Sequence, residues 1–382
     1  MADTRALIEQ SKPAAESQNR FGHSLLNLEA AAHPHENVFI SPVSLYLALA
    51  MTESGADGKT RTAMRKTLEI PESISEDAMH QSGAALLEAL RSQRGGELAI
   101  ANALWSNPNM PLAPAFIQKA KTVYDAEART LDFSKPAEAA DIVNAWVKDK
   151  TKGKIPSIVT PEVMRAAQAV LTNAVYFAGK WRREFWEGDT TDADFHLNGN
   201  GVKKVRMMLH RTLRGAYKSG DGYQAAALPY QGSSVAMYVI LPADGVTPEQ
   251  ALLKAAPGSL IEQNQPFDLE LRLPRFSIGY STSLKDTLTK MGMGIAFEYP
   301  GAEFAPMGSP LFFISQVVHK TRLEVDEKGT VAAAATAVIM GAGAGAPKPQ
   351  EKKVLVFDRP FALMICDSST GAVLFEGVVF EP

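Results

Sequence analysis

The stretch ISQVVHKTRLEVDEKGTVAAAATAVIMGAGAGAP (314–347) joins two kinds of sequence. Its beginning belongs to FFISQVVHKTRLEV (312–325), which has the β-branched and apolar content of a strand. From 329 to 347 there follow 19 residues without a charge. The GAGAGAP at the end is typical of a flexible linker, whereas the TVAAAATAVIM before it is not. The segment therefore does not fit the rest of the chain as an ordinary loop.

The composition is that of a large folded protein. The 382 residues are 46% hydrophobic and 21% charged, which supports a sizeable core and argues against disorder. The formal net charge is -3, and lysine and arginine are spread along the chain, so we expect no nucleic-acid partner. Cys366 is the only cysteine. The fold must therefore form without an internal disulfide, and Cys366 is expected to pack as a small apolar group.

Neither an export signal nor a membrane span is visible in the sequence. The N-terminal MADTRALIEQSKPAAESQ (1–18) lacks an apolar core, and no stretch of about 18 uncharged apolar residues follows it. As written, the chain is expected in the cytoplasm and without membrane contact. If an export signal is missing from this sequence, the alternative is an extracellular protein.

Helices are expected mainly in the first third of the chain. Ser41 can cap a helix that begins at Pro42, and SLYLALAM (44–51) continues it with apolar residues on nearly all sides, which predicts a buried helix. Helical periodicity also covers 60–68 and 138–150, both predicted as surface helices. In the second of them Ile142, Ala145 and Trp146 share one side.

Strands dominate from about residue 165 onward. They are predicted at 169–177, 223–230, 235–242, 268–274 and 312–325. Helices such as 283–292 lie between them without a regular alternation, so the pattern favours an α+β fold. Since no repeat or proline-rich linker marks a boundary, we expect one domain over 1–382.

Motifs for enzymatic chemistry are missing. GADGKT (55–60) looks like the end of a phosphate-binding loop, but Glu53 stands where that motif requires glycine. The sequence has no G-x-S-x-G elbow, no H-E-x-x-H pair and no Cys–His metal spacing. His33 and His35 are typical of a solvated loop rather than a ligand pair. We therefore expect no catalytic residue, no metal and no cofactor.

Seven separated segments, in the same order along the chain, carry a family resemblance. They are NVFISPVSLYLALAMTESGADGKT (37–60), IVNAWVKDKTKGKI (142–155), LTNAVYFAGKWRREF (171–185), LPRFSIGYSTSLKDTLTKMGM (273–293), ISQVVHKTRLEVDEKGT (314–330), FDRPFALMI (357–365) and TGAVLFEGVVFEP (370–382). These segments resemble the serpins, the serine protease inhibitors, and cover essentially the whole chain.

The resemblance implies both a fold and a mechanism. The fold has a large mixed sheet, two smaller sheets, about eight or nine helices and an exposed reactive-centre loop, here about 329–353. In the mechanism a serine endopeptidase attacks the loop and forms a covalent acyl-enzyme, and the cleaved loop then enters the large sheet and traps the protease. The implied partner is thus a serine endopeptidase, and the protein itself is expected to be a monomer.

The resemblance places a hinge where the strand becomes the loop. It comprises Glu327, Lys328, Gly329, Thr330, Val331, Ala332, Ala333, Ala334, Ala335 and Thr336. A strand that enters a sheet turns alternate side chains into the interior, and those side chains must be small or apolar. On one face this segment carries Thr330, Ala332, Ala334, Thr336, Val338 and Met340. None of them is charged and none is proline, so the hinge satisfies the requirement.

Further positions follow from the resemblance. Ser41, Ser44, Asn173 and His319 are expected in a polar cluster beneath the opening sheet, and Trp181 where the inserting strand first enters. Glu327 is expected to pair with a basic residue at the top of the sheet, and Gly329 to act as a flexible pivot.

The scissile bond is left open between several positions. Counting seventeen residues from Glu327 places it between Gly343 and Ala344, whereas counting back from Phe357 moves it downstream. Met340, Ala346 and Lys348 are the alternatives, although Pro349 disfavours cleavage after Lys348. The small residues at 340–346 suit an elastase-like or subtilisin-like protease.

Two other functions compete with inhibition. A non-inhibitory serpin would act as a chaperone, carrier or structural binder, but such members tend to carry charged, bulky or proline residues in the hinge. An ordinary enzyme or passive domain would use the Gly/Ala tract only as a linker. The composition of 330–338 favours inhibition over both.

Overall fold

The structure, a computed structural model, describes residues 4–92, 95–199, 201–262, 267–330 and 351–382. Ten α-helices and three β-sheets lie within these ranges. The predicted α+β class is confirmed. Among the described residues, no helix combines the length and apolar content needed to cross a lipid bilayer.

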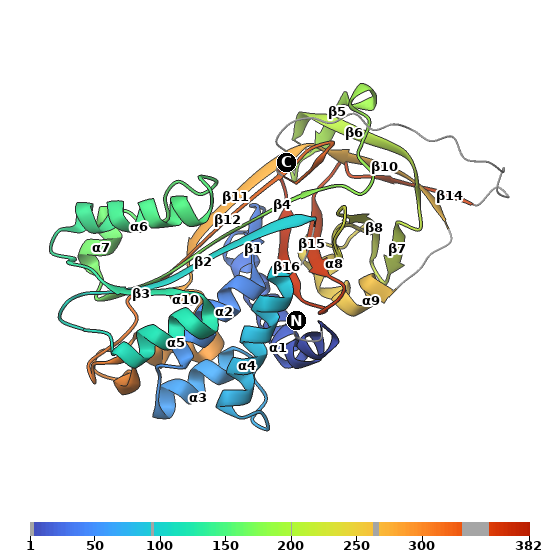
Figure 1. Ribbon diagram of the computed structural model, residues 1–382. Coiled ribbons are helices and arrows are strands. Elements are labelled where there is room, and N and C mark those ends of the chain that lie inside the picture. Colours follow the sequence, from blue (N-terminus) through green and yellow to red (C-terminus); the bar gives the residue numbers. More distant parts are fainter. Residues whose placement is uncertain (1–3, 93–94, 200, 263–266, 331–350) are drawn as a thin grey trace.

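The main sheet has six strands in the order β11-β12-β13-β4-β2-β3, and its long strands run diagonally through Figure 1. The strands are β2 (Gly96–Ser106), β3 (Glu127–Thr130), β4 (Ala169–Lys180), β11 (Phe276–Ser283), β12 (Gln316–Val325) and β13 (Gly329–Thr330). β4 and β12 are the strands predicted at 169–177 and 312–325.

The two central strands of this sheet meet over most of their length. β12 and β4 are parallel and paired through seven residue pairs, from Gln316 opposite Val170 to Arg322 opposite Tyr176. Beyond that point the two-residue β13 lies between them, antiparallel to both, with Thr330 opposite Val325 and Gly179. The main sheet is therefore closed along one part and parted at one end.

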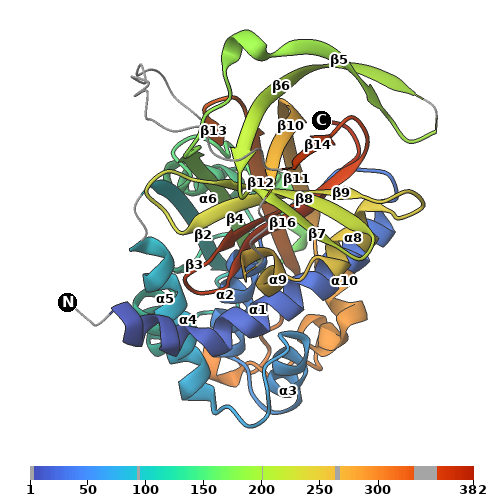
Figure 2. The ribbon, with the colours of Figure 1, turned by 90° about the vertical axis from the view of Figure 1, so that its right-hand side faces the viewer.

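Two more sheets pack beside the main one. The first has the order β1-β16-β15-β9-β8-β7, with β1 (Val38–Ile40), β7 (Tyr217–Gly220), β8 (Tyr223–Pro229), β9 (Val235–Pro242), β15 (Phe361–Asp367) and β16 (Val373–Val379). The other has the order β14-β10-β6-β5, with β5 (Thr191–His196), β6 (Val202–Arg214), β10 (Asp268–Pro274) and β14 (Lys352–Val356). Figure 2 shows the β5–β6 hairpin arching over the top of the molecule. Cys366 lies buried in β15, as predicted.

The helices cover the sheets from several sides. They are α1 (Thr4–Ala32), α2 (Pro42–Glu53), α3 (Gly58–Thr67), α4 (Glu76–Arg91), α5 (Pro114–Tyr124), α6 (Pro136–Lys150), α7 (Pro161–Ala166), α8 (Pro248–Lys254), α9 (Pro257–Glu262) and α10 (Lys285–Leu288). α6 and α7 lie on one face of the main sheet and α2 on the other, with α3, α4 and α5 grouped beyond α2 (Figure 1).

α2 is the buried helix that the sequence predicts. All 12 of its residues are buried, because its apolar side chains cover every side and have neighbours all round. Ser41 stands at its N-cap, but its side chain makes no capping bond. Instead the Ser41 hydroxyl donates to the Leu374 carbonyl at 2.6 Å, so the predicted capping role is wrong.

Two helices differ from the sequence-based expectation. α6 buries a neighbouring face, formed by Ala139, Ala140, Val143 and Val147, and leaves Ile142 and Trp146 at its flank. The small side chains allow a closer approach to the sheet than the predicted Trp146 face would. Of the helix expected at 283–292, only Lys285–Leu288 is α-helical; a π-helical segment, Thr289–Met293, follows it and is kinked at Gly292, which takes a positive φ of 107°.

Candidate functional site

A tight turn returns the chain into the main sheet directly after β12. The Asp326 carboxylate accepts hydrogen bonds from the backbone N–H of Lys328 (2.8 Å) and of Gly329 (3.0 Å). The Asp326 N–H in turn donates to the Gly329 carbonyl at 3.0 Å. This reversal brings Gly329 and Thr330 between β12 and β4.

Glu327 anchors the turn by its side chain. Its Oε1 accepts from Arg275 Nε (2.7 Å), Arg275 Nη2 (2.5 Å) and the Thr190 hydroxyl (2.5 Å). Burial alone would raise the pKa of Glu327, but these hydrogen bonds outweigh it and hold the pKa below its ordinary value. Lys328 forms an ion pair with Glu187 at 3.2 Å on the surface. The expected basic partner of Glu327 is thus Arg275.

Gly329 is needed for close packing rather than for a special backbone angle. A Cβ at this position would lie 2.1 Å from the Gly179 carbonyl oxygen on β4, far inside contact distance. Glycine therefore lets the backbone pass close to β4 where it enters between the two strands.

Thr330 already points into the core. It is fully buried, and its hydroxyl is hydrogen-bonded to the Tyr230 hydroxyl at 2.6 Å. Tyr230 stacks on Trp181, with ring centroids 4.7 Å apart. Trp181 holds the turn through its backbone N–H to Lys328 O and its indole N–H to Asp326 O, both at 2.9 Å. Thr330 therefore occupies the inward register that the alternation predicts.

The predicted polar cluster is assembled where β4 and β12 are directly paired. His319 on β12 lies opposite Asn173 on β4, and its Nδ1–H donates to Asn173 Oδ1 at 2.5 Å. The Ser41 backbone N–H donates to His319 Nε2 at 3.2 Å. Asn173 also donates to the Ser44 hydroxyl at 2.5 Å. Ser41, Ser44, Asn173 and His319 are thus in direct contact and completely buried.

Only the neutral form of His319 fits these bonds. Nε2 must accept from Ser41, so the ring proton resides on Nδ1. Burial lowers the pKa of His319 to about 3, since no anion offsets the loss of water. His319 therefore acts at neutral pH as a fixed hydrogen-bonding group that joins both central strands to the start of α2.

Trp181 does not belong to this cluster. It follows β4 eight positions after Asn173, which at the rise of an extended strand separates the two by about 25 Å. The structure therefore distributes the five predicted residues over two places. Four lie across the closed part of the sheet and one at its parted end.

Several side chains that complete both places are not evident from the sequence. Asn102 on β2 joins the cluster through Asn173 and donates to the Ser44 carbonyl at 3.2 Å. Tyr230 and Arg275 complete the hinge. None of the three lies near its partners in sequence.

The remaining predictions lie outside the described residues. They concern the hinge residues Val331, Ala332, Ala333, Ala334, Ala335 and Thr336, and the candidate cleavage positions Met340, Gly343, Ala344, Ala346 and Lys348. These positions therefore remain predictions from the sequence.

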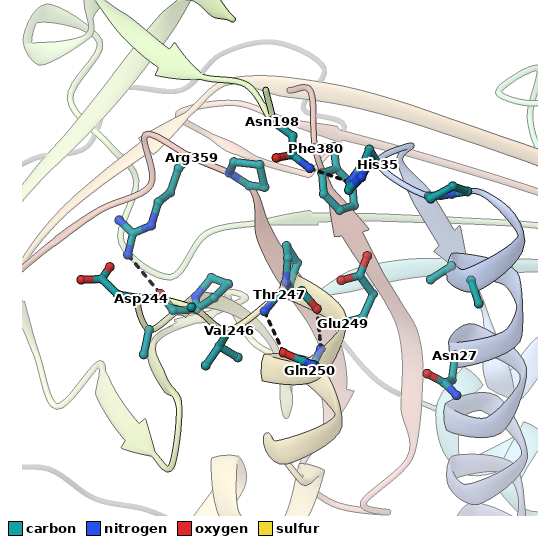
Figure 3. A pocket seen from close by; sticks show the side chains of 18 residues that line it. Asn27, His35, Asn198, Asp244, Val246, Thr247, Glu249, Gln250, Arg359 and Phe380 are labelled. Atoms are coloured by element: carbon teal, nitrogen blue, oxygen red, sulfur yellow. Dashed lines mark hydrogen bonds between the residues drawn. The ribbon is translucent and has the colours of Figure 1, made fainter. Parts of the chain in front are cut away.

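A surface cleft of about 710 Å³ lies between the end of α1, the loop after β9 and the start of α8 (Figure 3). Most of its central polar groups are bonded to protein neighbours. Thr247 and Gln250 form a reciprocal cap at α8, and Arg359 donates to the Pro242 carbonyl at 3.0 Å. No set of free polar groups therefore converges on one ligand there, and we assign the cleft no role.

The architecture above, with a parted main sheet and a returning strand, defines the class to which the chain belongs. The model of the family described as "Serpin (serine protease inhibitor)" matches residues 16–382. The chain therefore belongs to the serpin family, whose members are named as inhibitors of proteases rather than as enzymes.

Individual relatives agree with this membership. An uncharacterized serpin-like protein of Thermococcus kodakarensis is 36% identical over 98% of this chain and 87% of its own length. Leukocyte elastase inhibitor A of Rattus norvegicus is 33% identical over 95% and 97%. Among solved structures, human thyroxine-binding globulin in complex with thyroxine has a TM-score of 0.87 at 26% identity, covering 98% of this chain and 99% of that one.

Proposed function

We propose that this protein inhibits serine endopeptidases as a suicide substrate, through cleavage of the loop at 329–353 and insertion of its first half into the main sheet. One observation carries the proposal. Gly329 and Thr330 already form a strand between β12 and β4, and the sequence continues from there with uncharged residues that are small or apolar to position 340. The single domain 1–382 would then contain both the loop that the protease cleaves and the main sheet that accepts the cleaved loop.

The energetics of insertion favour completion once the loop is cut. The incoming strand is antiparallel to both neighbours, as β13 is. Insertion replaces one parallel ladder of seven residue pairs between β12 and β4 by two antiparallel ladders. About a dozen new hydrogen bonds at roughly 1 kcal/mol net each, together with apolar burial, supply a driving force on the order of 10 kcal/mol. While the loop is uncut, its far end stays joined to β14, which is paired with β10, and this connection opposes insertion.

The His319 cluster is the gate in this mechanism. It spans the strands that must separate, and its hydrogen bonds join β4, β12 and the start of α2. An inserting strand would part His319 from Asn173 and offer its own backbone groups in exchange. Buried groups that lose a partner cost about 1 to 3 kcal/mol each, so the gate opens only when replacements arrive.

The target is proposed to be an elastase-like or subtilisin-like protease. Small residues at 340–346 suit a shallow specificity pocket, and one relative is named a leukocyte elastase inhibitor. We place the scissile bond between Gly343 and Ala344, with Met340, Ala346 and Lys348 as alternatives. The expected product is a covalent one-to-one complex with a serine endopeptidase.

A carrier function is the second candidate, since thyroxine-binding globulin shares the fold. The hinge composition separates the two functions. Alanine and threonine at the inward positions permit insertion, whereas a carrier does not require it.

Incubation of the chain with elastase and with subtilisin tests the proposal. An inhibitor gives a covalent complex that survives denaturing electrophoresis, and sequencing of the released C-terminal fragment identifies the cut bond. Loop cleavage with continued turnover of both proteases, and no complex, contradicts the inhibitory function.

A further inference from the structure

A small cavity beside the hinge is lined by three arginines. It has a volume of about 130 Å³, and its walls include Trp181, Arg182, Arg183, Arg214, Leu228 and Pro229. The arginines come from two separate segments, the one that follows β4 and the end of β6. Tertiary structure thus places three like-charged, solvent-exposed side chains at one hollow, where a bound anion would reduce their mutual repulsion.

The three arginines are only weakly compensated by the protein. Arg183 makes no hydrogen bond or ion pair with any described residue. Arg182 reaches only the Ser233 carbonyl, at 3.4 Å. Arg214 approaches one carboxylate, with 3.6 Å between its Nε and Asp268 Oδ1. Since a guanidinium carries five donors in a planar fork, most of the donors in this hollow are available to a ligand.

The positive charge near the cavity also affects the pKa of the neighbouring His210. Burial lowers the pKa of His210, and the positive charge of Arg183 lowers it further. A neutral His210 therefore adds no positive charge. The exposed carboxylate of Glu184 follows Arg183 in sequence but does not line the cavity.

We propose that this cavity binds a tetrahedral oxyanion of the phosphate type, held by Arg182, Arg183 and Arg214. The planar donor pairs of arginine match the oxygens of such an anion, and the small volume favours a compact ligand over an extended one. Trp181 forms one wall and also bonds to Asp326 and Lys328 of the hinge turn. An anion in this site therefore stabilises Trp181 and, through it, the hinge turn at Asp326 and Lys328.

Titration of the intact chain with inorganic phosphate tests the site, with sodium chloride added to keep ionic strength constant. We expect saturable one-to-one binding by calorimetry and a higher Tm. Arg183→Gln and Arg214→Gln should each weaken binding about tenfold, the usual effect of losing one charged hydrogen-bond partner. Arg129→Gln, which removes an exposed charge on β3, should bind phosphate like the unaltered chain.

Protection from chemical modification provides a measurement on the unaltered chain. Phosphate should slow the reaction of phenylglyoxal with Arg182, Arg183 and Arg214 but not with Arg129, as mapped by mass spectrometry. The proposal is overturned if chloride raises the Tm as much as phosphate does, if both variants bind like the unaltered chain, or if phosphate protects none of the three arginines. Since no protease is involved, this result is independent of the inhibitory function.

Discussion

At the scale of single residues, His319 joins the two central strands in the closed part of the main sheet. It is fully buried and bridges Ser41 and Asn173, so its loss leaves the Ser41 N–H and the side-chain oxygen of Asn173 without these partners. The folded-state pKa of about 3 lies below the ordinary value of 6.5. Its contribution to stability is therefore complete above pH 6.5 and is lost as the pH falls toward 3. At neutral pH His319 is a structural group and not a switch.

His319→Ala should lower the stability of the intact protein. Two buried hydrogen bonds are lost, so we expect a decrease of about 2 to 4 kcal/mol in unfolding free energy, measured by denaturant titration at pH 7.5. The sheet should also open more readily, which gives faster conversion to inserted or associated forms on warming. His196→Ala is the matched control, because His196 is exposed on β5. Equal effects of the two substitutions would contradict the role of the cluster.

Thr330 tests the inward face of the hinge. Thr330→Arg would place a charge where a fully buried hydroxyl contacts Tyr230, at a desolvation cost of several kcal/mol. We expect the variant to be cleaved at an unchanged initial rate but to form no covalent complex, measured by electrophoresis against time. Val331→Arg is the control, since alternation in the proposed inserted strand would turn position 331 outward. A Thr330→Arg variant that still traps protease would show that Thr330 does not need to be buried.

At the scale of elements, α2 connects two buried polar regions. Its beginning carries Ser44 of the His319 cluster, and its end carries the buried Glu53. Glu53 is approached by His80 at 3.6 Å and by Arg65 at 3.8 Å. Other titratable or charged groups around it come from α2 itself and from the surrounding helices, namely Tyr46, Arg61, Glu76, Lys119 and Tyr124. Helix packing thus encloses a carboxylate whose ion-pair partner Arg65 lies beyond hydrogen-bonding distance.

Ionisation of the Glu53 carboxyl should affect how the free energy of unfolding depends on pH. Burial raises the pKa of Glu53 from 4.5 to about 7. Its contribution to stability is therefore present below pH 4.5 and is lost as the pH rises through 7. Glu53→Gln should gain on the order of 1 kcal/mol relative to the unaltered chain between pH 5 and pH 8, measured by denaturant titration at both values. Glu72→Gln is the control at an exposed position. A constant difference across this range would contradict the raised pKa.

Most elements could be predicted from local sequence. The strand predicted at 268–274 coincides with β10, because its apolar and polar residues alternate. The run at 44–51 predicts the buried helix α2, because its apolar residues lie on nearly all sides. β13 could not be predicted, since its two residues form a strand only between partners supplied by distant segments. The buried face of α6 was missed for a related reason. Packing against the sheet favours small residues over Trp146.

At the scale of the whole molecule, the described residues form three sheets and ten helices, and the main sheet is closed along one part and parted at one end. Its centre is closed by seven parallel residue pairs, and its end is parted by β13. The family resemblance of the sequence leads to Ser41, Ser44, Asn173 and His319 because those motifs are local. It does not lead to Asn102, Tyr230 or Arg275, whose partners are distant in sequence and are brought near only by folding.

The central claim is that the described sheet is metastable and gains a strand when the loop is cut. It is tested most directly by cleaving the loop within 340–348, for example with subtilisin, and comparing the Tm of intact and cleaved protein. The account predicts a rise of tens of degrees after cleavage, because a driving force on the order of 10 kcal/mol is large against the unfolding free energy of an ordinary domain. An unchanged or lower Tm, with the cut segment still open to exopeptidase digestion, would contradict it.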